Sequence, residues 1–205
     1  RTDQGDQHCP FLDAECKKPR KSTPEIKTGI CTVGYRTQTN NRFEPVVICP
    51  HRYRTEAVFN SLERHYFPPN SGSIIRWARE VSIGAGGSID YVLTKFRQDG
   101  HSTLEDFLCV EFQAAGTTGT PWEAILDFQK SRQFTKLNYK YGINWANEFA
   151  KTMMQQVYKK GMIVESWGKR IVFVLQDVGM DYLKQSYDIS GLHEPPSPDD
   201  SIHFY

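Results

Sequence analysis

The sequence lacks any apolar run that approaches the roughly 18 residues of a membrane-spanning helix, and no signal-peptide core is visible in it. It also lacks a charge excess, because 25 Lys and Arg residues are balanced by 24 Asp and Glu residues. Composition therefore does not single out a nucleic-acid binder. It does not exclude one either, since an enzyme that gathers carboxylates around a metal can be near neutral and still present a basic face.

Cysteine is scarce and unevenly placed. Four of the five cysteines fall in residues 1–52, namely Cys9, Cys16, Cys31 and Cys49. The gaps between them, 6, 14 and 17 residues, include no Cys-x-x-Cys pair. A polar segment this short needs a covalent or metal link to hold it together, either two disulfides in an oxidising compartment or one tetrathiolate metal site in a reducing one. The spacing leaves both open, and we expect Cys109 to be an ordinary buried thiol.

The division of the chain follows from this composition. At 205 residues the chain is long enough for one substantial core with a small appendage. We therefore expect a four-cysteine subdomain at 1–52 and a core domain at 53–205. The chain begins at Arg1 without Met and ends on Ser201–Tyr205, which has the pattern of a strand beginning. We expect a partial protein, with the core domain incomplete at its C-terminus.

Hydrophobic periodicity predicts three helices and four strands. The helices are expected at 56–66, ended by Pro68 and Pro69; at 74–81, with Glu80 near its end; and at 144–160, capped by Asn144 and stopped by Gly161. In the last of these, Trp145, Phe149, Thr152, Met153 and Gln156 share the inward face. The strands are expected at 88–96, 104–113, 171–175 and 201–205.

Two of these strands place polar groups inside an apolar setting. Side chains alternate along a strand, so Glu111 and Gln113 lie on one face and Phe112 on the other. A carboxylate on so apolar a strand costs several kcal/mol unless it is paired or bound to a metal. Asp90, on the preceding strand, is the nearest partner in sequence. The pair predicts an oxygen-ligand site for a hard divalent cation.

Two basic stretches leave their roles open. Lys17, Lys18, Arg20 and Lys21 surround Pro19, and a second mixture of basic and aromatic residues spans 130–141. Each is explained by a solvated loop or by a surface that contacts the phosphates of a nucleic acid.

The predicted order helix, strand, strand, helix, strand fits an α/β fold with a core like that of PD-(D/E)XK nucleases. The cysteine contexts add a more specific pattern: Cys9-Pro-Phe-Leu, Cys16-Lys, Gly29-Ile-Cys31-Thr-Val and Val47-Ile-Cys49-Pro-His-Arg, followed by Asp90 and Glu111-Phe-Gln113. Together these motifs resemble the NotI-like type II restriction endonucleases, and the resemblance covers most of the chain.

The resemblance implies a cytoplasmic, homodimeric enzyme that cuts both strands of a specific double-stranded DNA site. It implies that Cys9, Cys16, Cys31 and Cys49 hold one structural iron, a site that could also accept zinc. It further implies that Asp90 and Glu111 bind Mg²⁺, that Gln113 stands in the usual Lys position, and that Glu80 adds one more acidic group. Mg²⁺ would then activate water and stabilise charge on the phosphate, with Gln113 orienting the water by hydrogen bonding.

Other functions stay open on the sequence alone. A non-catalytic DNA-binding module stabilised by a metal would use the cysteines and leave Asp90 and Glu111 incidental. A defence nuclease with a different substrate would keep the chemistry and change the target. A secreted protein with two disulfides would use the cysteines differently again. The side chains that read DNA bases form no recognisable motif.

Overall fold

The computed structural model of the chain describes residues 8–20, 23–27, 29–36, 43–69, 72–98, 103–133, 135–136, 138–197 and 199–205. Internal contacts divide the chain into two compact units. The cysteine unit comprises Arg1–Arg52 and Ala114–Phe149, and the sheet unit comprises Tyr53–Gln113 and Ala150–Tyr205. The division into domains at 1–52 and 53–205 stays a prediction.

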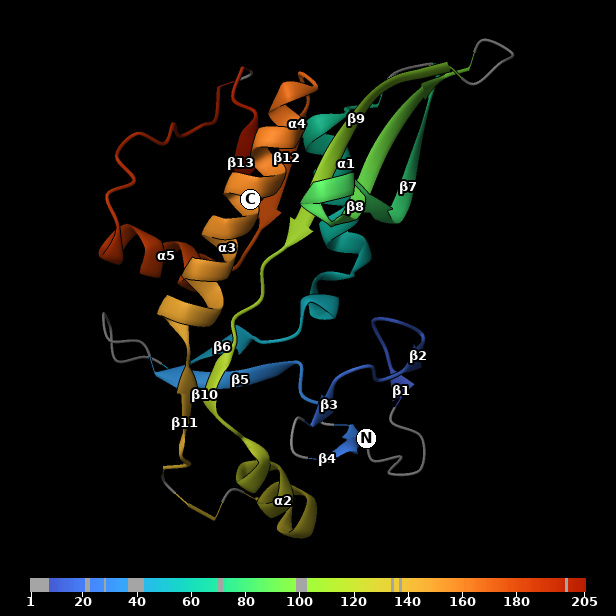
Figure 1. The fold of residues 1–205 in the computed structure, drawn as a ribbon. Coiled ribbons are helices and arrows are strands. Elements are labelled where there is room, and N and C mark those ends of the chain that lie inside the picture. The colour runs from blue at the N-terminus through green and yellow to red at the C-terminus, as the bar shows by residue number, and fades with distance from the viewer. Residues whose placement is uncertain are drawn as a thin grey trace. The chain divides into compact units, whose positions relative to one another are not determined.

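The cysteine unit is built from short antiparallel strand pairs (Figure 1). Within its described residues the pairs are β1 (His8–Cys9) with β2 (Ala14–Glu15), β3 (Pro19–Arg20) with β4 (Thr23–Lys27), β5 (Thr32–Arg36) with β6 (Phe43–Val47), and β10 (Thr117–Gly119) with β11 (Tyr141–Ile143). Helix α2 runs over Trp122–Ser131, and a π-helical segment covers Trp145–Ala150. A lone two-stranded pair is marginally stable in water, so this unit depends on further contacts.

The sheet unit is organised around one five-stranded mixed sheet in the order β13-β12-β9-β8-β7 (Figure 1). Its strands are β7 (Ser73–Ser82), β8 (Ser88–Arg97), β9 (Thr103–Phe112), β12 (Arg170–Val174) and β13 (Ile202–Phe204). Neighbours β7, β8 and β9 pair antiparallel, whereas β12 runs parallel to both β9 and β13. This mixed α/β arrangement fits the restriction-endonuclease-like fold expected from the sequence.

Helices cover both faces of this sheet. They are α1 (Glu56–Tyr66), α3 (Lys151–Gln156), α4 (Met162–Ser166) and α5 (Asp177–Ser186), and a π-helical turn over Val157–Gly161 joins α3 to α4. On one face, Phe59 of α1 packs edge-on against Tyr91 and Phe112, with ring centroids 5.1 and 6.0 Å apart. On the other face, Val164 of α4 packs into the sheet.

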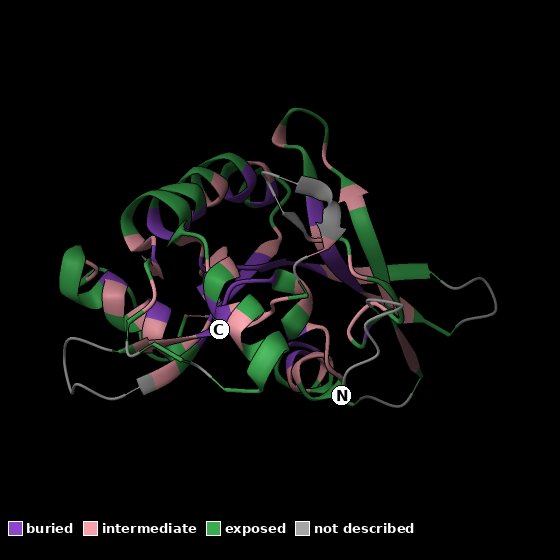
Figure 2. Ribbon diagram, turned by 90° about the horizontal axis from the view of Figure 1, so that it is seen from below, coloured by how far each residue is buried: buried purple, intermediate pink, exposed green. Residues whose placement is uncertain are grey.

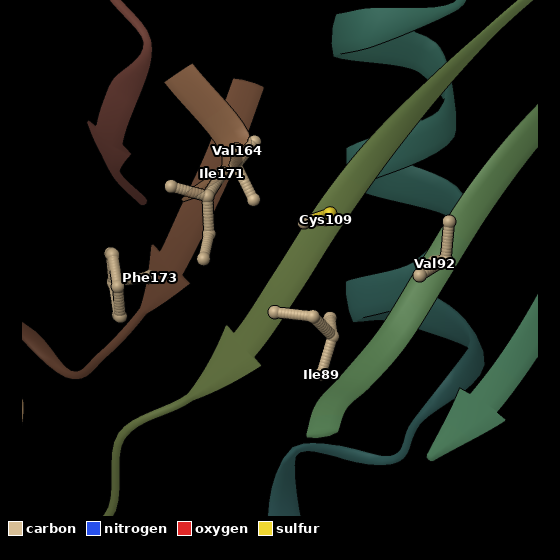
Figure 3. Packing of buried hydrophobic residues seen from close by; sticks show 6 residues of the cluster. All are labelled: Ile89, Val92, Cys109, Val164, Ile171 and Phe173. Carbon is tan, nitrogen blue, oxygen red and sulfur yellow. The ribbon is translucent and has the colours of Figure 1, made fainter. Parts of the chain in front are cut away.

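The core on the α4 side is a compact cluster of buried apolar residues. Its members are Ile89, Val92, Cys109, Val164, Ile171 and Phe173 (Figure 3). The second half of β9, residues 108–112, and residues 171–174 of β12 are buried (Figure 2). Each buried Val, Ile or Phe side chain contributes about 1.5–3 kcal/mol, so this cluster fixes the register of the central strands. The thiol of Cys109 lies inside it, as expected, and burial raises its pKa to about 12.

Most predicted elements are confirmed, and one helix is wrong. The expected helix at 74–81 is strand β7, which pairs with β8 along nearly its whole length. Its apolar positions fit both periods, and the β-branched Ile74, Ile75 and Val81 favour an extended chain once β8 offers a partner. Glu80 therefore lies on a strand.

The predicted stop at Gly161 is also wrong. The helical run continues through α4 to Ser166. Gly161 is instead a site of close approach, because a Cβ there would lie 2.7 Å from Cδ1 of Ile202 on β13. The cap at the other end of the run is confirmed: the side-chain oxygen of Asn144 accepts a hydrogen bond from the Asn147 backbone N–H at 3.2 Å.

Candidate active site

Asp90 and Glu111 lie beside each other where the pairing of β8 with β9 ends. The last regular pair is Tyr91 with Val110. One position further, side chains replace backbone partners: the Phe112 N–H donates to Oδ2 of Asp90 at 2.9 Å, and the Asp90 N–H donates to Oε1 of Glu111 at 3.3 Å. The two carboxylates thus hold the strand ends together, and both belong to the sheet unit.

Glu111 is the most deeply buried acidic group of the site. Its side chain is 2% exposed. Burial raises the pKa of Glu111 to about 7, and the nearby charge of Asp90 adds to that rise. The Lys160 ammonium opposes it by donating to Oε1 of Glu111 at 2.7 Å. A cation bound at this carboxylate would favour its ionised form in the same way.

Asp90 and Glu80 form a second acidic pair. Burial raises the pKa of Asp90, the Phe112 N–H and Lys160 lower it, and Glu80 raises it again. Glu80 lies opposite Asp90 in the register, between the pairs Arg79–Tyr91 and Val81–Ile89. Its φ of +52° falls in the left-handed region, which costs a non-glycine residue about 1–3 kcal/mol. The exposed Glu80 side chain is therefore near the site, but on an irregular strand and not a helix.

Gln113 is the second buried polar residue of the site and follows Glu111 by two positions. Its side chain is 6% exposed, and its amide donates to Oε1 of Gln156 on α3 at 2.5 Å. Its backbone is fixed on both sides, because the N–H donates to the Val174 carbonyl at 2.8 Å and the carbonyl accepts from the Tyr53 hydroxyl at 3.1 Å. The amide is thus held rigidly in line with Glu111, and it carries no charge.

Lys160 is the residue of the site that the sequence analysis missed. The expected helix ended near it, and the basic residues considered for DNA binding lay elsewhere. A signal was present, because Lys160 follows Gln156 by four residues and so continues the inward face of the helix. It is 9% exposed, which is rare for lysine unless a partner is present.

The donor set suits a hard divalent cation. In the described part of the chain, no donor is hydrogen-bonded to Oε2 of Glu111 or to Oδ1 of Asp90. A buried carboxylate oxygen without a donor is costly, and a cation relieves that cost. Mg²⁺ is commonly bound by one or two carboxylates together with water and substrate phosphates. Among the described residues, no group of three or more His, Cys, Asp or Glu side chains is arranged as a closed metal site.

The four N-terminal cysteines gather in the cysteine unit. A hydrogen bond to Cys49 and burial raise the pKa of the Cys31 thiol, and the nearby Cys9 and Cys16 raise it further. Matching turns follow two of them: the Leu12 N–H donates to the Cys9 carbonyl at 3.2 Å and the Arg52 N–H to the Cys49 carbonyl at 3.0 Å. All five cysteines are free thiols. Among the described residues, no set of three or more cysteines is placed to hold one ion.

The basic stretches have specific local partners. Lys18 is turned inward, donates to the Ile48 carbonyl at 2.5 Å and lies near Cys16, Cys31 and Cys49. Lys136 forms an ion pair with Glu123 on α2. Lys21 lies outside the described residues, as does Phe134 in the second stretch. The phosphate-contacting surfaces suggested for these stretches stay predictions.

A family model described as restriction endonuclease NotI matches residues 1–192. No curated protein matches the chain. No helix within the described residues is both long and apolar enough to cross a membrane.

Proposed function

The chain belongs to the NotI restriction endonuclease family and is thereby a DNA-cleaving enzyme, and from this premise we propose that it hydrolyses both strands of a specific double-stranded DNA site with Mg²⁺. The observation that carries the proposal is the pair Asp90 and Glu111. These carboxylates are adjacent on a mostly buried sheet face, and each keeps one oxygen without a donor from the described residues. Such oxygens are suited to a cation that a phosphate can share.

Each side chain then has a distinct part. Mg²⁺, when bound, supplies the Lewis acidity that favours attack of water on the phosphorus and stabilises the leaving oxygen. Asp90 and Glu111 hold the cation, and their own positions are fixed by the Phe112 and Asp90 backbone N–H groups. Gln113 orients the water through its amide, because it has no charge to offer. Glu80, exposed beside Asp90, would add negative charge near the cation.

The proposed enzyme acts as a homodimer. Cutting both strands of a duplex at one site requires two active centres of opposite polarity, and a two-fold pair of chains supplies them. The sheet unit contributes one Asp90–Glu111 pair per chain, which fits this stoichiometry. The proposed location is the cytoplasm, where a restriction enzyme meets DNA.

We propose further that Cys9, Cys16, Cys31 and Cys49 bind one structural iron or zinc. The donor chemistry fits, because soft thiolates select these metals. The thiols already interact with one another, and Lys18 brings a compensating positive charge toward three of them. The metal would contribute folding free energy to a unit made of strand pairs.

The test is cleavage of mixed-sequence plasmid DNA by purified protein, with Mg²⁺ and with EDTA, followed by sequencing of the ends. Discrete Mg²⁺-dependent fragments with one shared end sequence are expected. Elemental analysis of the same sample should give about one iron or zinc per chain. Specific DNA binding without cleavage would favour the non-catalytic module. Cleavage of single strands or of modified DNA alone would favour another defence nuclease.

A further inference from the structure

The proposed site has a deficit of positive charge on its own strand. Hydrolysis of a phosphodiester places extra negative charge on the phosphate oxygens, and fixed cations at that point stabilise the transition state. The residue two positions after Glu111 is the neutral Gln113. Asp90 and Glu111 add negative charge. A cation from another part of the chain would add to the charge that the metal supplies.

Lys160 is placed to fill this need. Its Nζ lies 2.7 Å from Oε1 of Glu111, with 11% of the lysine side chain and 2% of the glutamate side chain exposed. It also lowers the pKa of Asp90, so its charge reaches both carboxylates. Glu111 is its one ion-pair or hydrogen-bond partner among the described residues. An ammonium has three donors, so two remain for a water or a phosphate oxygen.

The spacing of two contact residues on the helix matches the spacing of their partners on β9. Gln156 contacts Gln113, and Lys160, four residues on, contacts Glu111, two residues back. Four residues along a helix rise about 6 Å and two along a strand about 6.6 Å, so the two pairs are in step. Lys160 lies within the π-helical turn Val157–Gly161, a feature that often marks functional sites because it re-aims side chains.

We propose that Lys160, delivered from the helix, supplies the fixed positive charge of the active site in place of a lysine at position 113. It holds Glu111 in orientation and presents its charge and its remaining donors where the phosphate enters. This inference rests on the proposed function, because it assigns a role within the same site. A purely structural ion pair would require only a hydrogen-bonding partner for Glu111.

The experiment exchanges the two side chains. Lys160→Gln removes the charge and keeps an amide that can donate to Glu111. The swap variant, Gln113→Lys with Lys160→Gln, restores the composition and moves the charge to β9. Lys159→Gln is the matched control, because Lys159 is the exposed neighbour in the same turn. Circular dichroism and melting temperature establish that each variant folds.

Cleavage rate is the first readout. We expect Lys160→Gln to lose about 100-fold or more, Lys159→Gln to stay within about threefold of the unaltered protein, and the swap variant to regain at least about tenfold. A structural role predicts no recovery in the swap variant. If Lys160→Gln does not fold, the swap variant compared with Gln113→Lys alone decides the same point.

Affinity for Ca²⁺, measured by calorimetry without DNA, is the second readout and needs no cleavage. An ammonium beside Glu111 repels a divalent cation, so Lys160→Gln should bind Ca²⁺ roughly tenfold more tightly. Unchanged affinity together with unchanged cleavage would overturn the inference. If the unaltered protein cleaves no DNA under any condition, the proposed function fails. The Ca²⁺ comparison would still report whether Lys160 places a positive charge at this site.

Discussion

The two units are stabilised in different ways. The sheet unit buries a continuous cluster that includes Ile171 and Phe173, both 0% exposed. The cysteine unit has short strand pairs and gathers four thiols. Apolar burial explains why the first folds, whereas the second is made of short strand pairs that the proposed metal would stabilise further. The comparison teaches that the proposed hard-cation site rests on a core that apolar burial stabilises, whereas the proposed soft-metal site would itself be part of the fold.

The largest expected effect lies in the sheet unit. Glu111→Ala removes a proposed cation ligand and leaves Lys160 without its partner, so cleavage should fall by about 1,000-fold or more. Specific DNA binding in Ca²⁺ should stay detectable by gel shift, because only one side chain of the proposed cation site is changed. Glu165→Ala, an exposed acidic residue on α4, is the control. Retained cleavage in Glu111→Ala would remove Glu111 from the site.

The next effect belongs to the cysteine unit. Cys31→Ser weakens a tetrathiolate site, so bound iron or zinc should drop from about one per chain to a small fraction, measured by elemental analysis. Limited proteolysis should then cut within 1–52 first. Cys109→Ala, in the sheet core, should leave metal content unchanged. Equal metal content in Cys31→Ser and the unaltered protein would contradict the thiolate site.

A substitution in the core of the sheet unit tests whether the two units are stabilised separately. Phe173→Ala leaves a cavity in the sheet unit and should lower the free energy of unfolding by about 3–5 kcal/mol, measured by urea denaturation. Iron or zinc content should persist as long as the protein is folded, because none of the four N-terminal cysteines lies in this core. A parallel loss of metal in folded protein would mean that the two units are not stabilised separately.

The smallest expected effect is a pH dependence within the sheet unit. Burial lowers the pKa of His203 from 6.5. In the neutral ring, Nδ1 accepts a hydrogen bond from the Tyr66 hydroxyl at 3.0 Å, and Nε2 donates one to the Asp200 carbonyl at 2.9 Å. The unfolded chain then takes up a proton at higher pH than the folded one, so stability falls as pH drops below about 6.5.

The check is the melting temperature between pH 7.5 and 5.5. The decline should be shallower in His203→Gln than in the unaltered protein, after both are compared at pH 7.5. His8→Gln, at an exposed position in the cysteine unit, should follow the unaltered protein. Identical slopes for all three would show that His203 does not titrate differently in the folded state.

The contrast also explains what the sequence could reveal. The alternation of side chains along 88–96 and 104–113 was enough to predict that Asp90 and Glu111 lie close together. Side chains on a strand repeat every two residues, and the two strands follow each other in the sequence. Segment 74–81 failed because its apolar spacing fits two periods and its pairing with β8 decides between them. Such a tertiary choice is not written in the segment itself.

Lys160 illustrates a second limit. Its inward position followed from the helical repeat, but its partner is 49 residues away on β9. The π-helical turn that carries it, and the continuation past Gly161 against Ile202, depend on packing between elements. Helix α5 was likewise missed. Local pattern predicted the carboxylates, and tertiary structure was needed to find the cation beside them.

The most direct test of the central claim is diffraction from crystals soaked in Mn²⁺, recorded for its anomalous scattering. Mn²⁺ prefers the same oxygen ligands as Mg²⁺ and is visible directly. The account predicts a peak about 2.2 Å from a carboxylate oxygen of both Asp90 and Glu111. Strong peaks elsewhere, with none between these two carboxylates at saturating Mn²⁺, would contradict it.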